Sequence, residues 1–89
     1  MVRRDVLIVN ALGLHARAAA RFVQTAVRFK SRIIVSRDGR SADGKSILGL
    51  LALLGSQGSR LTVIADGSDE QEASRALCDL VEDRFGEES

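Results

Sequence analysis

The segment Asn10-Ala11-Leu12-Gly13-Leu14-His15-Ala16-Arg17-Ala18-Ala19 marks the point where one structural pattern in the chain gives way to another. Before it, Asp5 to Val9 is a short, β-branched, apolar run, which predicts a strand. Beyond Arg17 the period becomes that of a helix, which we expect to end near Lys30. One face of this helix is apolar and the opposite face is polar, with Ala19, Phe22, Val23, Ala26 and Val27 against Arg17, Arg21, Gln24 and Arg28.

The middle of the chain predicts a hairpin followed by a short helix. Arg32 to Arg37 is a strand candidate, Asp38-Gly39 is a strong two-residue turn signal, and Arg40 to Asp43 is polar and short, as suits an exposed edge strand. Ser46 is placed as a helix N-cap. The apolar residues that follow run almost all the way round the helix before Gly55 and Gly58, and they are Ile47, Leu48, Leu50, Leu51, Leu53 and Leu54.

The last third of the chain predicts one strand and one helix. Leu61 to Ala65 is the strand, and Ser68 with Gln71 fits a capping box at the start of the helix. The helical period is carried by Ala73, Ala76, Leu77, Leu80 and Val81. Gly86 is predicted to stop this helix, and we expect the tail Glu87-Glu88-Ser89 to be frayed.

This order of elements predicts an α+β fold in a single domain that spans residues 1–89. The expected form is one antiparallel sheet with helices stacked on one face. A domain of this size has little room for a deep pocket, so its function should lie on the surface.

Composition narrows the function classes. The chain has 13 basic and 12 acidic residues, and it contains three Phe but no Trp or Tyr, which argues against a nucleic-acid partner. No apolar run approaches a membrane span, and no secretory signal stands at the N-terminus. The single cysteine, Cys78, cannot form an internal disulfide. Together these features predict a cytoplasmic protein without membrane insertion.

His15 is the one histidine, and it precedes the first predicted helix. The unpaired N–H groups and the dipole of a helix N-terminus favour an anion such as phosphate. With Arg17 nearby, a nucleophilic imidazole there has the parts of a phosphoryl acceptor. A surface or capping role is the commoner one for such a histidine, so the residues alone leave both readings open. One His and one Cys far apart make no metal site, and no cofactor is expected.

Two features follow Asp43. Ser46 is an N-cap whatever else it does, and a phosphate there would place negative charge beside a docking surface. Residues 39–46 also match the GxxxxGK[ST] pattern of a P-loop, but an edge strand in the loop and a very short helix indicate a chance match. Ile47, Leu48 and Leu51 either face outward as a protein contact, with Leu50 and Leu53 inward, or belong to a fully buried helix.

The two segments Asn10 to Ala19 and Gly44-Lys45-Ser46-Ile47-Leu48-Gly49 resemble the active-site and serine segments of the HPr family, the histidine phosphocarriers of the phosphotransferase system. Their separation and the order of elements also match, so the resemblance covers about Val2 to Phe85. It implies an HPr-like open-faced β-sandwich with a four-stranded antiparallel sheet and three helices.

The resemblance also implies roles. His15 would be phosphorylated on Nδ1 by phosphorylated enzyme I, with phosphoenolpyruvate as the original donor, and would pass the group to an enzyme IIA. Arg17 matches the phosphate-site arginine, and Ser46 matches the serine modified by an HPr kinase/phosphorylase. Partner-binding positions would be Ala20, Ile47, Leu48 and Leu51. The protein would be a monomeric protein substrate and donor, and not an autonomous enzyme.

One position departs from the family pattern. The family commonly has proline after the arginine, whereas this chain has Ala18, which should still form a helix. The alanine-rich stretch and Glu-rich end also resemble the nitrogen-related branch, in which the transfers regulate. Two alternatives are a regulatory binding module switched at Ser46, without a sugar transport role, and a small RNA-binding domain that uses Arg17, Arg21 and Arg28.

Overall fold

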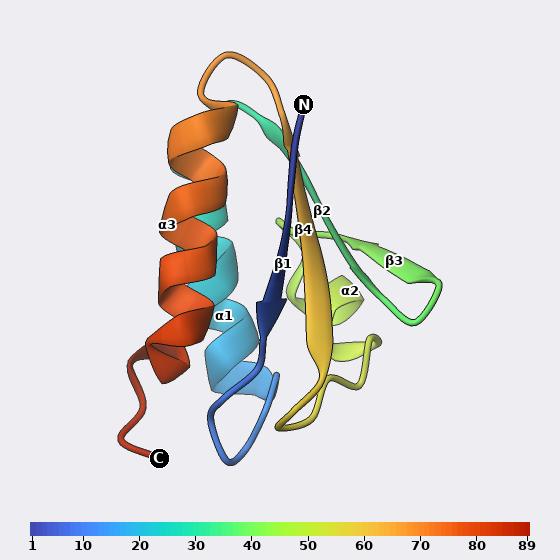
Figure 1. Cartoon of the computed structure of the whole chain (residues 1–89), viewed down its shortest axis with the longest axis vertical. Coiled ribbons are helices and arrows are strands. Elements are labelled where there is room, and N and C mark those ends of the chain that lie inside the picture. Colours follow the sequence, from blue (N-terminus) through green and yellow to red (C-terminus); the bar gives the residue numbers. More distant parts are fainter.

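The computed structural model describes all 89 residues. The elements in chain order are β1 (Val2–Leu7), α1 (Ala16–Ala26), β2 (Arg32–Arg37), β3 (Arg40–Asp43), α2 (Ile47–Leu51), β4 (Arg60–Asp66), α3 (Glu70–Glu82) and a 3₁₀ helix at Arg84–Gly86. The four strands form one antiparallel sheet in the order β1-β4-β2-β3. Helices α1 and α3 lie side by side on one face of this sheet, and the other face is open (Figure 1). The expected open-faced α+β sandwich is therefore confirmed.

The core forms between the sheet and the helices. Alternate residues of β4, which are Leu61, Val63 and Ala65, point inward and are fully buried, because side chains alternate between the two faces of a strand. In the register, Leu61 lies opposite Val6 of β1, and Val63 lies opposite Val35 of β2. The buried face of α1 contributes Ala18, Ala19, Phe22 and Ala26 to the same core.

The hairpin expected at Asp38-Gly39 is present, and it joins β2 to β3. Both turn residues have positive φ, 48° for Asp38 and 81° for Gly39, as a tight hairpin turn of this kind requires. β3 forms the edge of the sheet, as its short polar sequence predicts.

Strand β1 begins earlier than predicted. The sequence pattern starts it at Asp5, but pairing with β4 extends to Val2, which lies opposite Ala65. Arg3 and Arg4 are exposed and charged, so the apolar pattern that predicts a strand does not include them. Their backbone is nevertheless part of β1, because strand pairing depends on the neighbouring strand.

Two helices end earlier than predicted. Helix α1 stops at Ala26, so Val27 is its C-cap and is exposed rather than part of the buried face. Helix α2 spans only five residues and stops at Leu51. Leu50 and Leu53 are buried as expected, but Leu54 turns outward with φ 56° and is 69% exposed.

The capping box predicted at Ser68 and Gln71 is absent. The N-cap of α3 is Asp69, and its carboxylate caps no helix N–H. The carboxylate instead accepts hydrogen bonds from Lys30 and Ser31, which lie immediately before β2. A tertiary partner has therefore displaced the local motif.

Candidate functional site

His15 lies at the N-cap of α1, in extended backbone conformation with φ −81° and ψ −179°. Its carbonyl accepts the first helical hydrogen bond, from Ala19 N–H at 2.8 Å, but its imidazole makes no capping bond. The side chain is 24% exposed. The capping role is therefore excluded, and the ring lies where the helix dipole favours a negative group.

The loop that carries His15 is held tightly against the loop after α2. Gly13 has φ +67°, and a Cβ on it would lie only 2.5 Å from the carbonyl oxygen of Gly55. Leu14 N–H donates to that same oxygen at 2.8 Å. The fully buried Asn10 donates from Nδ2 to the carbonyl of Gly13 at 2.8 Å. These contacts fix the position from which α1 starts.

The C-terminal tail lies on the site, so the expectation that it is frayed is wrong. One carboxylate oxygen of Glu87, Oε2, contacts His15 Nε2. The other, Oε1, accepts from Asn10 Nδ2 at 2.8 Å. Ala11 N–H donates to the main-chain oxygen of Ser89 at 2.8 Å. Figure 1 shows the C-terminal end and the β1–α1 loop at the same end of the molecule.

A left-handed turn after α3 directs this tail. Arg84, Phe85 and Gly86 all have positive φ, of 58°, 53° and 79°. Such a conformation is costly for non-glycine residues, so tertiary contacts must hold it. Phe85 is fully buried, and its carbonyl accepts from Arg21 Nη1 at 2.5 Å. The turn therefore reverses the chain toward His15.

The tail adds a carboxylate, that of Glu87, to a site that also contains the His15 imidazole and the Arg17 guanidinium. The hydrogen bond from Asn10 lowers the pKa of Glu87, and His15 and Arg17 act in the same direction against the opposing effect of burial. Arg17 is exposed and lines a pocket beside the site together with Leu12, Arg21, Gly86, Glu87, Glu88 and Ser89. The structure thus brings the predicted pair His15 and Arg17 to one location, together with an acidic partner that sequence reasoning missed.

Ser46 is the N-cap of α2, as predicted, and its Oγ accepts from Gly49 N–H at 3.0 Å. The P-loop match at residues 39–46 is a coincidence, because Gly39 lies in the hairpin turn and residues 40–43 form β3. No loop wraps a phosphate there.

An apolar surface surrounds α2, which packs against α1. Leu48 is 80% exposed and Ile47 is also exposed, whereas Leu51 and Ala20 are half-buried. The outward orientation of Ile47 and Leu48 is thus confirmed. The sequence prediction missed two further exposed residues, Leu12 and Leu54. For Leu12, the sequence signal that could have predicted exposure is an apolar side chain next to a loop glycine, Gly13.

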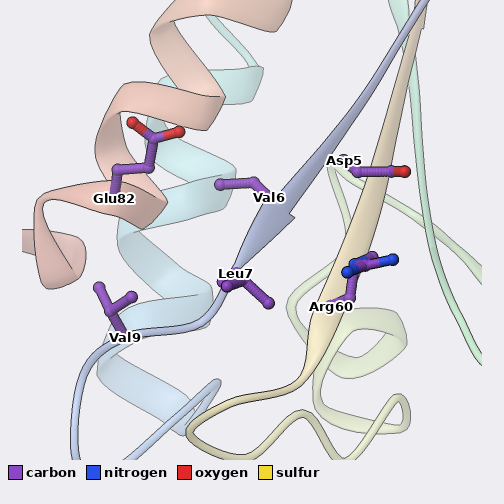
Figure 2. A pocket seen from close by; sticks show the side chains of 6 residues that line it. All are labelled: Asp5, Val6, Leu7, Val9, Arg60 and Glu82. Carbon is purple, nitrogen blue, oxygen red and sulfur yellow. The ribbon is translucent and has the colours of Figure 1, made fainter.

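A different pocket runs along β1 and contains neither His15 nor Arg17. Figure 2 shows Leu7 and Val9 from the chain at the end of β1, and Glu82 from α3. Its remaining lining residues are Asp5, Val6 and Arg60. With two carboxylates and one guanidinium, this pocket does not favour an anion.

Comparison with known proteins agrees with this architecture. Residues 2–83 match the family model described as "PTS HPr component phosphorylation site". The phosphocarrier protein HPr of Cupriavidus necator is 51% identical over 87 residues, which cover 98% of each chain. The crystal structure of HPr-C-His from Thermoanaerobacter tengcongensis has a TM-score of 0.95 and 48% identity, and covers both chains completely.

Fold and site together define a small open-faced sandwich with a histidine at a helix N-terminus. The chain belongs to the HPr family, the phosphocarriers of the phosphotransferase system. A further solved relative, Crh of Bacillus subtilis, has a TM-score of 0.76 and 44% identity over 94% of this chain and 97% of its own. It is described as a dimer with a swapped domain, so the monomeric state expected here stays a prediction. No helix of the fold has the length and apolar character needed to cross a bilayer.

Proposed function

We propose that His15 accepts a phosphoryl group from phosphorylated enzyme I and passes it to an enzyme IIA. The observation that carries this proposal is the position of the imidazole, which is partly exposed at the N-terminus of α1 and not used as a cap. The protein would act as a carrier between the two partners, and phosphoenolpyruvate would be the original donor.

The chemistry follows from the surroundings of the ring. Nδ1 attacks phosphorus as the bond between phosphorus and the donor breaks. The N–H groups of the first turn of α1 and the exposed guanidinium of Arg17 stabilise the charged oxygens during transfer. Because Arg17 lies at the surface, it can contact the group while the donor or acceptor protein is docked.

The docking surface proposed for both partners consists of Ala20, Ile47, Leu48 and Leu51, and we call these residues the apolar docking patch. Leu48 and Ile47 provide most of its exposed apolar side chains. Exposed clusters of this kind bury well against a protein partner. Since α2 packs on α1, a partner on this patch lies next to the helix that carries the His15 site.

Ser46 supports a regulatory function at the same surface. It precedes Ile47 and Leu48, so a phosphate on its hydroxyl would add negative charge at the border of the docking patch. An HPr kinase/phosphorylase with ATP would supply this phosphate. A binding module switched only at Ser46 is the competing function, and it requires no transfer through His15.

The test of the transfer uses purified enzyme I and phosphoenolpyruvate, and locates acid-labile phosphate by mass spectrometry. We expect one phosphate on His15 in the unmodified chain and none on His15→Ala. Undiminished acid-labile labelling of His15→Ala would refute the proposal. Arg17→Ala should slow labelling, whereas Arg28→Ala, which also removes an exposed arginine, should leave the rate unchanged.

A further inference from the structure

Glu87 is the one residue outside the β1–α1 loop and α1 whose side chain contacts the His15 ring by a polar interaction. It is only 10% exposed, although it stands close to the end of the chain. Its two oxygens are divided between two partners, Oε2 with His15 Nε2 and Oε1 with Asn10 Nδ2. Both contacts are specific and partly buried, so the tail is part of the site's architecture.

The hydrogen-bond directions determine where the imidazole proton lies. Asn10 Nδ2 faces two oxygens, the Gly13 carbonyl and Glu87 Oε1, so the amide of Asn10 must donate to both. An ionised carboxylate only accepts hydrogen bonds. The second oxygen of Glu87 therefore takes a proton from His15 Nε2, and in a neutral ring this leaves the lone pair on Nδ1.

We propose that Glu87 is a positioning residue that holds His15 in the tautomer with Nε2 protonated and Nδ1 free to attack phosphorus. This inference rests on the proposed role of His15 as phosphoryl acceptor. The carboxylate acts through the far side of the ring and does not contact the phosphoryl group. The same division of labour orients the histidine in hydrolase triads.

The charge balance of the transfer gives Glu87 a second effect. The Nδ1 lone pair forms the new bond to phosphorus, and the donor keeps the electron pair of the bond that breaks. The Nε2 proton stays on the ring, which becomes a cationic phospho-imidazolium. The adjacent carboxylate of Glu87 stabilises this positive charge. When the ring later passes the phosphoryl group to an acceptor, the electron pair of the bond between Nδ1 and phosphorus returns to Nδ1 and the ring becomes neutral again.

Glu87→Gln provides the sharpest test, because it keeps the shape of the side chain. If the amide oxygen keeps the bond from Asn10, the amide NH₂ faces His15 Nε2 and requires an acceptor there. The proton would then move to Nδ1, which loses its nucleophilic lone pair. Glu88→Gln is the matched control, because it makes the same charge change on the exposed neighbouring residue.

Two measurements are made on each variant. NMR of the ring nitrogens in the free protein reports which nitrogen carries the proton, and the rate of labelling by enzyme I reports phosphoryl acceptance. We expect Nε2–H in the unmodified protein and in Glu88→Gln, and a shift toward Nδ1–H in Glu87→Gln. Labelling of Glu87→Gln should be slower by about 10- to 100-fold.

The outcomes separate this inference from the proposed function. An unmodified protein that is not labelled at His15 would refute the proposed function itself. If the unmodified protein is labelled normally, the inference fails in either of two cases. One is that Glu87→Gln is labelled at the unmodified rate, and the other is that it slows while its Nε2 keeps the proton.

Discussion

Ser31 donates twice to one oxygen of Asp69. Its backbone N–H and its hydroxyl both reach Oδ1, at 2.9 Å and 2.5 Å, across a separation of 38 residues. Lys30 N–H donates to the other carboxylate oxygen at 2.8 Å. The pair thus ties the start of β2 to the start of α3. The hydroxyl of Ser31 is the main cause of the lowered pKa of Asp69, and the backbone of Lys30 adds to it.

The first prediction concerns Asp69→Asn. Because folding lowers the pKa of Asp69, its stabilising contribution is present above the ordinary pKa of an aspartate and is lost as the pH falls through the folded value. We expect Asp69→Asn to unfold at a lower urea concentration than the unmodified protein at about pH 7. The difference should shrink below about pH 4.

The control for this variant is Glu88→Gln, which removes an exposed carboxylate that lies outside the helices. Its unfolding midpoint should follow the unmodified protein across the same pH range. A gap between Asp69→Asn and the unmodified protein that is equally large at both pH values would contradict the assignment, because it would not depend on ionisation.

The second prediction concerns Gly13→Ala. The methyl group would enter a left-handed position and would meet the carbonyl of Gly55 at 2.5 Å and the Cα of Ser56 at 2.9 Å. Backbone strain and overpacking together should lower the free energy of unfolding by about 2–4 kcal/mol, measured by urea denaturation. In Gly58→Ala, which has φ +88° but nothing within 4 Å, only the strain should be seen. Equal losses in the two variants would show that the close approach of the two loops is unimportant.

The third prediction separates the two roles of Ser46. Ser46→Ala loses the cap on Gly49 N–H and should lower the free energy of unfolding by about 1 kcal/mol. Ser46→Asp keeps a capping oxygen and should be close to the unmodified protein in stability. Its negative charge should nevertheless slow phosphoryl acceptance from enzyme I. Normal acceptance by Ser46→Asp would argue against a regulatory phosphate at this position.

The fourth prediction tests the apolar docking patch. Leu48 is 80% exposed, so Leu48→Ala should change the free energy of unfolding by less than about 0.5 kcal/mol. The KM for this protein as substrate of enzyme I should rise about 5- to 30-fold, which corresponds to a loss of one or two kcal/mol of binding. Leu7→Ala, on β1 and outside the patch, serves as the control and should leave KM unchanged. A rise of equal size in both variants would place the docking surface elsewhere.

Local patterns were sufficient for much of the fold. The change of period after His15, the Asp38-Gly39 turn and the Ser46 cap each involve residues within a few positions of one another, so the amino acids themselves specify the conformation. These signals placed His15 at the start of α1 and Ser46 at the start of α2, and both placements are confirmed. The bounds of β1 were less accurate, because its pairing with β4 depends on residues far along the chain.

The sequence by itself therefore determined the order of elements and the position of the lone histidine, since both follow from short-range periodicity and capping. The tertiary structure decided which groups surround that histidine. Asp69, and not the predicted Ser68, is the N-cap of α3, and its carboxylate binds Ser31. Glu87 contacts His15 across a separation of 72 residues. That contact exists because α3 packs along α1 and a left-handed turn anchored by the buried Phe85 reverses the chain. Only packing between distant elements can hold such a turn, so no local pattern around Glu87 could have revealed its place beside His15.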